Sequence, residues 1–141
     1  MHLKKIFTFL VISFALQTLW SQEADTSNFE IFNYEAEGKT YIMQQYFLVF
    51  LKKGSTKSAS KEEASDIQNK HLAYLGDLFK KGFICMNGPF GDDGEIRGAT
   101  IYRVSTAEEA LRLASGDPAV KAGRFELEVH PWWLAQDTGV R

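Results

Sequence analysis

The sequence predicts one α+β domain in which strands and helices follow one another in the order β-α-β-β-α-β. Two helices are indicated by a serine three residues before a glutamate, at Ser60 with Glu63 and at Ser105 with Glu108. In such a capping box the hydroxyl accepts the amide N–H of the glutamate, whose carboxylate reaches back to the serine amide. Apolar, strand-like runs precede, separate and follow these helices. At 141 residues the chain is long enough for one domain with a well-buried core.

The first residues are expected to be a signal peptide rather than part of the fold. Lys4 and Lys5 form a short basic segment, and residues 6–16 are almost entirely apolar. Ser21 offers a small residue for cleavage, so we expect residues 1–21 to be removed and the protein to be exported, to the periplasm or outside the cell. The apolar run is shorter than the roughly 20 residues of a membrane-spanning helix, so we expect no stable membrane insertion after cleavage.

The charge balance argues against a nucleic-acid partner. The chain has 16 Lys and Arg and 18 Asp and Glu, for a formal net charge of −2. Loss of Lys4 and Lys5 with the signal peptide makes this charge two units more negative. A mildly acidic domain with scattered lysines lacks the positive surface that nucleic acid requires.

Cys85 is the only cysteine, so no disulfide can form within the chain. It lies between Ile84 and Met86 in an apolar run. We therefore expect it to be a small buried hydrophobic residue rather than a nucleophile.

The first strand is expected over residues 41–51, after a polar extension, residues 22–40, that either adds a strand to the domain or stays loose. From Tyr46 to Leu51 this strand is apolar at both parities, which indicates that both of its faces are buried.

The first helix is predicted to begin at the Ser60 cap and to run to about Lys81, with Gly82 as its stop. Its expected apolar stripe consists of Leu72, Leu75, Leu78 and Phe79.

Two strands, at 83–86 and 96–104, are predicted to form a hairpin around residues 87–98. This connection is rich in glycine, proline and aspartate, which are typical turn formers.

The second helix is expected over residues 106–115, with Gly116 at its end. It is expected to pack through Ala110, Leu111 and Ala114. Asp117 followed by Pro118 is typical of an N-cap with proline at the first helical position, which predicts a short helical turn. The last strand alternates polar and apolar residues from Phe125 to Val129 and is expected to stop at Pro131, before an apolar tail, residues 132–134.

This order is that of a ferredoxin-like fold, a four-stranded antiparallel sheet with two helices on one face. We place the domain at residues 41–134 and a C-terminal tail at 135–141. Because two helices cover only one face while the first strand is apolar on both, we expect the second face to pair with the same face of another copy, giving a homodimer.

Several short segments resemble those of the YCII-related (YciI-like) family of the dimeric α+β barrel superfamily. They are His71 to Leu75, Gly88 to Phe90 with Asp92 to Gly94, Arg97 and Gly98, Ser105 with Glu108 to Ala110, Asp117 to Val120 with Ala122 to Arg124, and Glu128 to Trp132. They keep their order over about residues 46–133. The resemblance implies a ferredoxin-like dimer with a small cleft beside the sheet and a His–Asp active site, carried here by His71 and Asp117. It also implies an enzymatic role, and ring dehydrohalogenation has been attached to some members.

The residue types at these two positions suit proton transfer. His71 adjoins the expected apolar stripe, and a histidine with a pKa near 6.5 acts readily as a general acid or base. An aspartate bonded to the ring would fix its tautomer. Asp117 can combine this role with capping, since one carboxylate oxygen can cap the helix while the other reaches the imidazole.

Arg97 and Arg124 are expected on strands that flank the cleft, where they could clamp an anionic ligand. The remaining candidates for ligand contact are Pro89, Phe90, Asp92 and Ser105. Asp92 is also a typical turn residue.

We expect no metal and no cofactor. Ligand atoms are available from His71, Asp92, Asp93, Asp117 and His130, but their spacing matches no metal-binding motif. No glycine-rich loop leads from a strand into a helix, which disfavours a nucleotide site.

Two functions stay open. The first is a cofactor-free small-molecule enzyme, of lyase, isomerase or hydrolase type, that uses His71 with Asp117. The second is a non-catalytic periplasmic module that binds a small ligand in the same cleft. A pocket in which His71 is bonded to Asp117 favours the enzyme, whereas an apolar slot with a solvated His71 favours the binding module.

Overall fold

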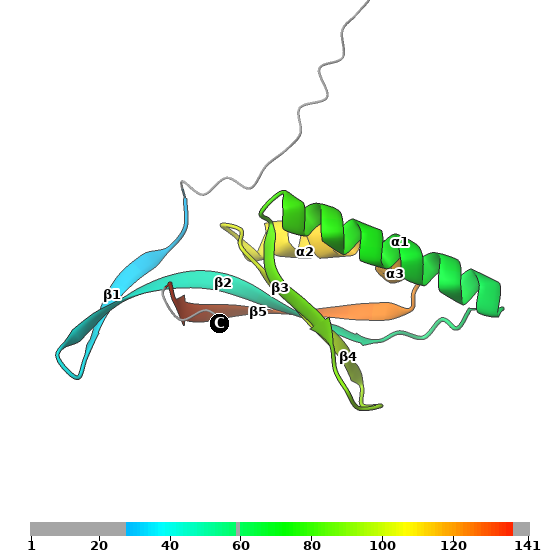
Figure 1. Cartoon of the computed structure of the whole chain (residues 1–141), viewed down its shortest axis with the longest axis horizontal. Coiled ribbons are helices and arrows are strands. Elements are labelled where there is room, and N and C mark those ends of the chain that lie inside the picture. Colours follow the sequence, from blue (N-terminus) through cyan, green and yellow to red (C-terminus); the bar gives the residue numbers. More distant parts are fainter. Residues whose placement is uncertain (1–27, 59, 137–141) are drawn as a thin grey trace, which may run out of the picture.

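The computed structural model describes residues 28–58 and 60–136, which form one antiparallel sheet with helices on one of its faces (Figure 1). The strands are β1 (Ile31–Ala36), β2 (Lys39–Lys53), β3 (Ile84–Pro89), β4 (Ile96–Tyr102) and β5 (Phe125–Ala135). The helices are α1 (Lys61–Lys80), α2 (Ala107–Ser115) and α3 (Pro118–Lys121). The expected signal peptide, residues 1–21, lies outside the described residues. None of the helices within the described ranges is long and apolar enough to span a membrane.

Strand β2 is the centre of the sheet. It pairs with β5 along one edge and with β4 along the other, and β3 pairs with β4. From β2 to β5 the elements follow the predicted β-α-β-β-α-β order, so the expected ferredoxin-like α+β class is confirmed.

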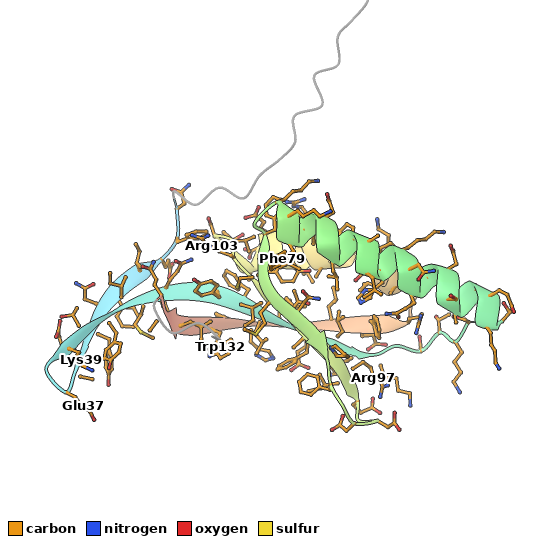
Figure 2. All side chains as sticks on the ribbon, in the orientation of Figure 1. Glu37, Lys39, Phe79, Arg97, Arg103 and Trp132 are labelled. Carbon is orange, nitrogen blue, oxygen red and sulfur yellow. The ribbon has the colours of Figure 1, made fainter. Side chains whose placement is uncertain are left out.

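The extension adds a fifth strand, β1, which pairs with residues 39–44 of β2. The turn between them has two residues with positive φ, Glu37 at 52° and Gly38 at 72°, as expected for a tight hairpin of type I′. Glu37 and Lys39 lie at the tip of this arm, which projects away from the helices (Figure 2).

The core lies between the helices and one face of the sheet. Alternate residues of β2, Phe47, Val49 and Leu51, are buried there because successive side chains of a strand point to opposite faces. We call the other side the open face; it carries Leu48, Phe50, Ile101 and Trp132. In the single chain this face is covered by no described helix, and Leu48 and Phe50 are only partly buried.

The predicted stripe of α1 is confirmed at Leu75 and Leu78 and was wrong at the two other positions. The helix buries His71, Leu75 and Leu78, whereas Leu72 and Phe79 are both 55% exposed. Residues i, i+4 and i+7 share one face of a helix, and the inward face begins at His71 because its ring is bonded inside the fold.

The N-terminus of α2 also differs by one residue from the prediction. Thr106, not Ser105, is the cap, and its hydroxyl accepts the amide N–H of Glu109 at 3.1 Å. The helix buries Ala110, Leu113 and Ala114. Leu111 was expected to pack inward, but it is exposed. The inward face of α2 carries Ala110, Leu113 and Ala114, and Leu111 lies outside it.

Two predictions about strands were wrong. Strand β5 does not stop at Pro131 but continues to Ala135, with Pro131 opposite Phe47. Among the described strands β5 pairs only with β2, and an edge strand tolerates proline where an N–H would point away from its single neighbour. Strand β3 likewise runs past Met86 to Pro89, which shortens the hairpin loop to residues 90–95.

Cys85 is exposed, contrary to the prediction. The register between β3 and β4 shifts between Ile84 and Met86, so Cys85 is the extra residue of a β-bulge. Its thiol donates to the carbonyl of Ile101 at 3.6 Å, and partial burial of the sulfur raises the pKa of this thiol.

Candidate functional site

His71 and Asp117 meet between α1 and the start of α3. The Nδ1 atom of His71 lies 2.6 Å from Oδ2 of Asp117, and the two side chains are 8% and 3% exposed. His71 lies on the inward face of α1, about three turns after the Ser60 N-cap. The two residues are 46 positions apart in the sequence, and the packing of α1 beside α3 brings their side chains together.

Both carboxylate oxygens of Asp117 are used. Oδ1 accepts the amide N–H of Ala119 at 2.8 Å, which is the N-cap bond of α3, and Oδ2 accepts from the ring of His71. Since a carboxylate is an acceptor, Nδ1 is the protonated nitrogen of the neutral ring. Nε2 bonds to no residue in the described part of the chain, so it is the ring nitrogen left for a ligand.

His71 lies in the wall of a cleft of about 270 Å³ between α1, the β3–β4 hairpin and the start of β5. Apolar side chains from β2 and α1, among them Leu51 and Leu75, line one part of it. The ring of Phe125 closes one side, with its centroid 5.6 Å from that of His71. The result is a small cleft of mixed apolar and polar lining that presents a histidine.

Two arginines, Arg97 and Arg124, line the cleft. Arg124 donates to the carbonyl oxygen of Ala64 at 3.2 Å, and its guanidinium carbon lies 5.8 Å from the centroid of the Phe125 ring. Arg97 donates to the carbonyl oxygens of Asp92 and Gly94, at 3.3 and 3.4 Å. Both arginines are half-buried, so their positions are held while their charge remains accessible.

The predicted ligand-contact residues separate into two groups. Pro89, Arg97 and Arg124 line the His71 cleft, whereas Phe90, Asp92 and Ser105 do not. Phe90 lies on the open face, in a hollow of about 390 Å³ with Phe50 and Trp132. Asp92 accepts the N–H of Gly94 within the hairpin loop, and Ser105 precedes the cap of α2.

Sequence reasoning missed several residues of the cleft. They are Gln68, Asn87, Thr100 and Phe125. Gln68 was within reach of a sequence argument, because it lies three positions before His71 and so shares its helix face. The others lie in the cleft because of strand pairing, which leaves no local signal.

Two tyrosines close to Asp117 stay protonated near neutral pH. Burial raises the pKa of Tyr74, and the negative charge of Asp117 raises it further. Burial also raises the pKa of Tyr102. The Tyr74 hydroxyl donates to the carbonyl of Leu113 at 2.8 Å. Both phenols therefore stay neutral beside the Asp117 carboxylate.

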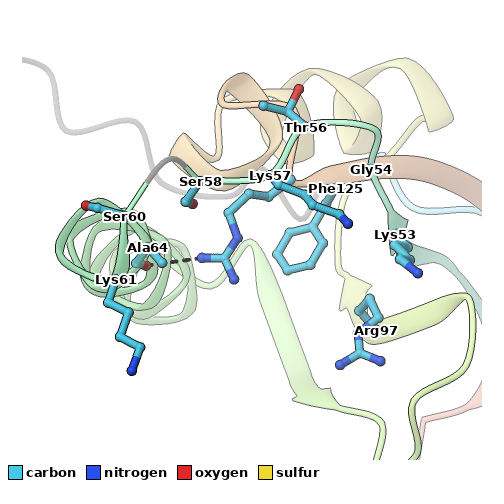
Figure 3. A pocket seen from close by; sticks show the side chains of 11 residues that line it. Lys53, Gly54, Thr56, Lys57, Ser58, Ser60, Lys61, Ala64, Arg97 and Phe125 are labelled. Carbon is cyan, nitrogen blue, oxygen red and sulfur yellow. Dashed lines mark hydrogen bonds between the residues drawn. The ribbon is translucent and has the colours of Figure 1, made fainter.

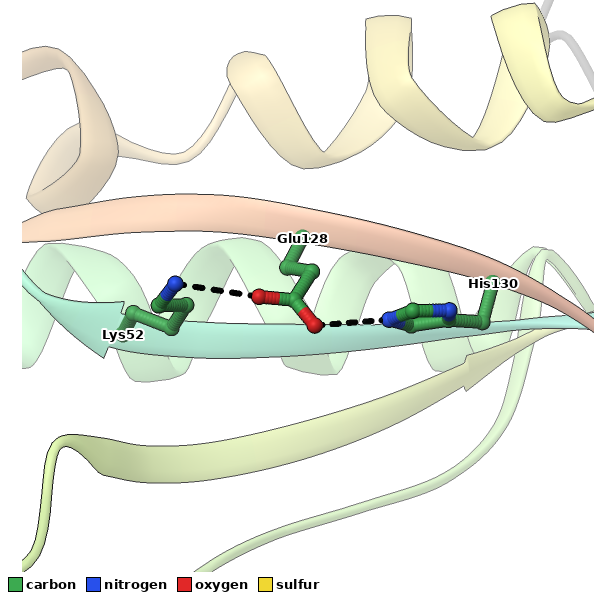
Figure 4. Close-up of polar contacts among 3 residues, drawn as sticks. All are labelled: Lys52, Glu128 and His130. Carbon is green, nitrogen blue, oxygen red and sulfur yellow. Dashed lines mark hydrogen bonds and ion pairs between the residues drawn. The ribbon is translucent and has the colours of Figure 1, made fainter.

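A second polar cluster lies on the open face, where Glu128 bridges Lys52 and His130 (Figure 4). Its oxygens lie 3.0 Å from Lys52 Nζ and 2.7 Å from His130 Nε2. The His130 hydrogen bond, and after it the Lys52 contacts, lower the pKa of Glu128. Across residues 28–58 and 60–136, no three His, Cys, Asp or Glu side chains come together as a metal site would require.

Among solved structures, 5-chloro-2-hydroxyhydroquinone dehydrochlorinase (TftG) from Burkholderia phenoliruptrix AC1100, in complex with 2,5-dihydroxybenzoquinone, is similar to this chain. It is 28% identical over 62% of this chain and 92% of that one, with a TM-score of 0.46. No curated protein matches the chain. The family profile of the YCII-related domain matches residues 46–133, which is more than half of the sequence. As its motifs predicted, the chain belongs to the YCII-related domain family.

Proposed function

We propose that this chain is a small-molecule enzyme in which His71 moves a proton to or from a substrate in the cleft. The observation that carries the proposal is the buried 2.6 Å contact between His71 Nδ1 and Asp117 Oδ2 at the wall of the cleft. Because Asp117 accepts from Nδ1, the substrate proton is taken by Nε2. The charge of Asp117 then stabilises the imidazolium ion that forms.

The chemistry that this pair supports is general acid–base catalysis. Nε2 removes a proton from the substrate and returns it to a second atom of the substrate, to a leaving group or to water. Such a sequence serves a lyase, an isomerase or a hydrolase. Proton transfer of this kind uses only the imidazole of His71 and the carboxylate of Asp117.

The second candidate function, a non-catalytic binding module, would be favoured by a solvated histidine in an apolar slot. Here the His71 side chain is 8% exposed and bonded to a carboxylate that is itself fixed by a helix cap. A histidine held this way has a defined tautomer and a defined direction, which proton transfer needs and simple ligand binding does not. This contrast favours the enzyme.

The test is hydrogen–deuterium exchange at carbon. The mature protein is incubated in D₂O with a panel of small keto acids, hydroxy acids and phenols, and loss of C–H signals is followed by NMR. His71→Asn keeps a donor near the Nδ1 position but removes Nε2, so exchange should be lost. His130→Asn is the matched control, because His130 lies on the open face, and it should retain exchange. A compound that perturbs the cleft resonances but undergoes neither exchange nor conversion would instead support the binding module.

We also propose that the mature chain is exported and pairs with a second copy through the open face. The hollow that contains Phe50, Phe90 and Trp132 supports the pairing, because Phe90 and Trp132 are 44% and 41% exposed in the single chain. Clustered aromatic side chains of this kind are stabilised when a second surface covers them. The basic and apolar segments that precede residue 21 support export.

A further inference from the structure

A second and larger cavity opens beside the His71 cleft, and its charge is one-sided (Figure 3). We call this cavity of about 550 Å³ the vestibule. Its lining includes the basic side chains Lys53, Lys57, Lys61, Arg97 and Arg124, and none of the described residues that line it is acidic. A chain with more acids than bases thus gathers five bases around one hollow.

The charges of the vestibule are poorly balanced within the chain. Three lysines elsewhere have carboxylate partners, namely Lys52, Lys70 and Lys81, whereas Lys39, Lys80 and Lys121 form no ion pair among the described residues. Within residues 28–58 and 60–136, the three vestibule lysines form no ion pair. Arg97 has one, with Asp93 at 3.5 Å, but the Asp93 side chain is fully exposed, and solvent weakens such a contact.

The positions of these bases are set by main-chain hydrogen bonds between segments distant in the sequence. The amide of Gly54 donates to the carbonyl of Arg124 at 2.8 Å, and that of Lys53 donates to the carbonyl of Glu95 at 2.8 Å. Position 54 must be glycine, because a Cβ there would collide with the carbonyl oxygen of Gly123. The segment that carries Lys53 and Lys57 is therefore locked against the segments that carry Arg124 and Arg97.

The vestibule and the His71 cleft share three lining residues, Arg97, Arg124 and Phe125. The ring of Phe125 lies beneath the Arg124 guanidinium on one side and 5.6 Å from the His71 ring on the other. A ligand that places a negative group among the bases can therefore extend past Phe125 to Nε2 of His71. Charge binds one end of such a ligand, and proton transfer acts at the other.

We propose that the vestibule binds an oxyanion, a carboxylate or a phosphate, of the substrate and that the enzyme acts on small anionic molecules. This inference rests on the proposed function, because it names the substrate class of the same cleft. Clustered bases of one sign attract anions, and guanidinium groups bind carboxylate and phosphate in a forked geometry. The apolar part of the substrate then lies against Leu51, Leu75 and Phe125 in the inner cleft.

The test measures binding of benzoate and phenyl phosphate, with neutral benzamide as the uncharged control, by NMR of backbone amides and the His71 ring. Lys53→Gln, Lys57→Gln and Lys61→Gln are combined in one variant. Lys39→Gln, Lys80→Gln and Lys121→Gln are combined in the matched control, which has the same net charge. All six lysines are exposed, so both variants should keep their fold.

Binding of both anions should weaken about tenfold in the vestibule variant and change less than about twofold in the control. Added salt should weaken anion binding in the wild type more than in the vestibule variant. Equal affinities in the two variants, or benzamide that binds as tightly as benzoate, would overturn the inference. His71→Asn separates the two proposals. It should abolish exchange and leave anion binding intact, whereas exchange that persists in it would defeat the proposed function alone.

Discussion

Asp117 holds His71 with one carboxylate oxygen, at 2.6 Å, and the first turn of α3 with the other. One carboxylate therefore joins the candidate site to the local fold. Its two tasks can be separated by substitution, because asparagine keeps an oxygen for the cap but offers an N–H where the second carboxylate oxygen was.

Asp117→Asn should change the tautomer of His71 while the fold is retained. Asparagine caps helices about as well as aspartate, so the melting temperature should change little. The amide N–H would face Nδ1 as a donor, which shifts the ring proton to Nε2 and removes the base from the cleft. We expect ¹⁵N NMR to show the new tautomer and proton exchange to fall about 10²- to 10⁴-fold. An unchanged tautomer with a large loss of stability would leave Asp117 as a cap only.

Thr106→Ala should destabilise the protein more than Ser105→Ala. Thr106 accepts the N–H of Glu109 at the start of α2, and loss of such a cap costs about 1 kcal/mol. Ser105 has no capping role in the structure, so its substitution should cost less than about 0.5 kcal/mol. Urea unfolding of the two variants measures both values, and a loss in Ser105→Ala that equals or exceeds that in Thr106→Ala would contradict the cap at Thr106.

Phe50→Asp should make the protein a monomer. The charge would lie on the open face, where pairing with a second copy would bury it at high cost. Sedimentation of the wild type at micromolar concentration should give twice the mass of the mature chain, and the variant should give once that mass. Phe79→Asp is the control, since Phe79 is exposed on α1, and it should remain dimeric. A monomeric wild type would contradict pairing through this face.

The stability that Glu128 contributes should disappear in acid. The pKa of Glu128 lies below its ordinary value of 4.5, first because of the hydrogen bond from His130 and then because of Lys52. A lowered pKa means that this contribution is complete above the unfolded value and is lost as pH falls through the folded one. The difference in melting temperature between wild type and Glu128→Gln should therefore shrink between pH 6 and pH 3. A difference that stays constant with pH would show that the charge of Glu128 has no part in it.

Export predicts a defined N-terminus. Mass spectrometry of the protein from its native cell should find Gln22 or a near neighbour as the first residue, because Lys4, Lys5 and the apolar run direct cleavage close to Ser21. Recovery of the intact chain from the cytoplasm would contradict the proposed localisation.

Short sequence motifs predicted most of the fold. The Ser60 cap and the Asp117–Pro118 step predicted where α1 and α3 begin, because capping depends on a few neighbouring residues. Gly82 has the positive φ expected of a residue that ends a helix. The same locality explains why the two site residues could be named from motifs in the sequence.

The features that short motifs could not predict depend on contacts between segments distant in the sequence. Inward placement of His71 follows from its bond to Asp117, and exposure of Cys85 follows from a bulge that only strand pairing reveals. In the sequence, nothing distinguishes Lys53, Lys57 and Lys61 from ordinary surface lysines. Lys53 and Lys57 face the cavity because the Gly54 amide binds the Arg124 carbonyl, a contact between residues seventy positions apart in the sequence, and Lys61 reaches it from the start of α1.

Strand β1 has a consequence for the association of one molecule with another. It lies along the part of β2, residues 39–44, that precedes the segment paired with β4. Without it, these residues would present a row of unsatisfied amide and carbonyl groups beside the exposed Ile42. Such an edge is a template for sheet growth from one molecule to the next. By pairing with this segment, β1 satisfies those groups and moves the edge of the described sheet to a strand of only six residues, on which Ile31, Phe32 and Tyr34 are exposed.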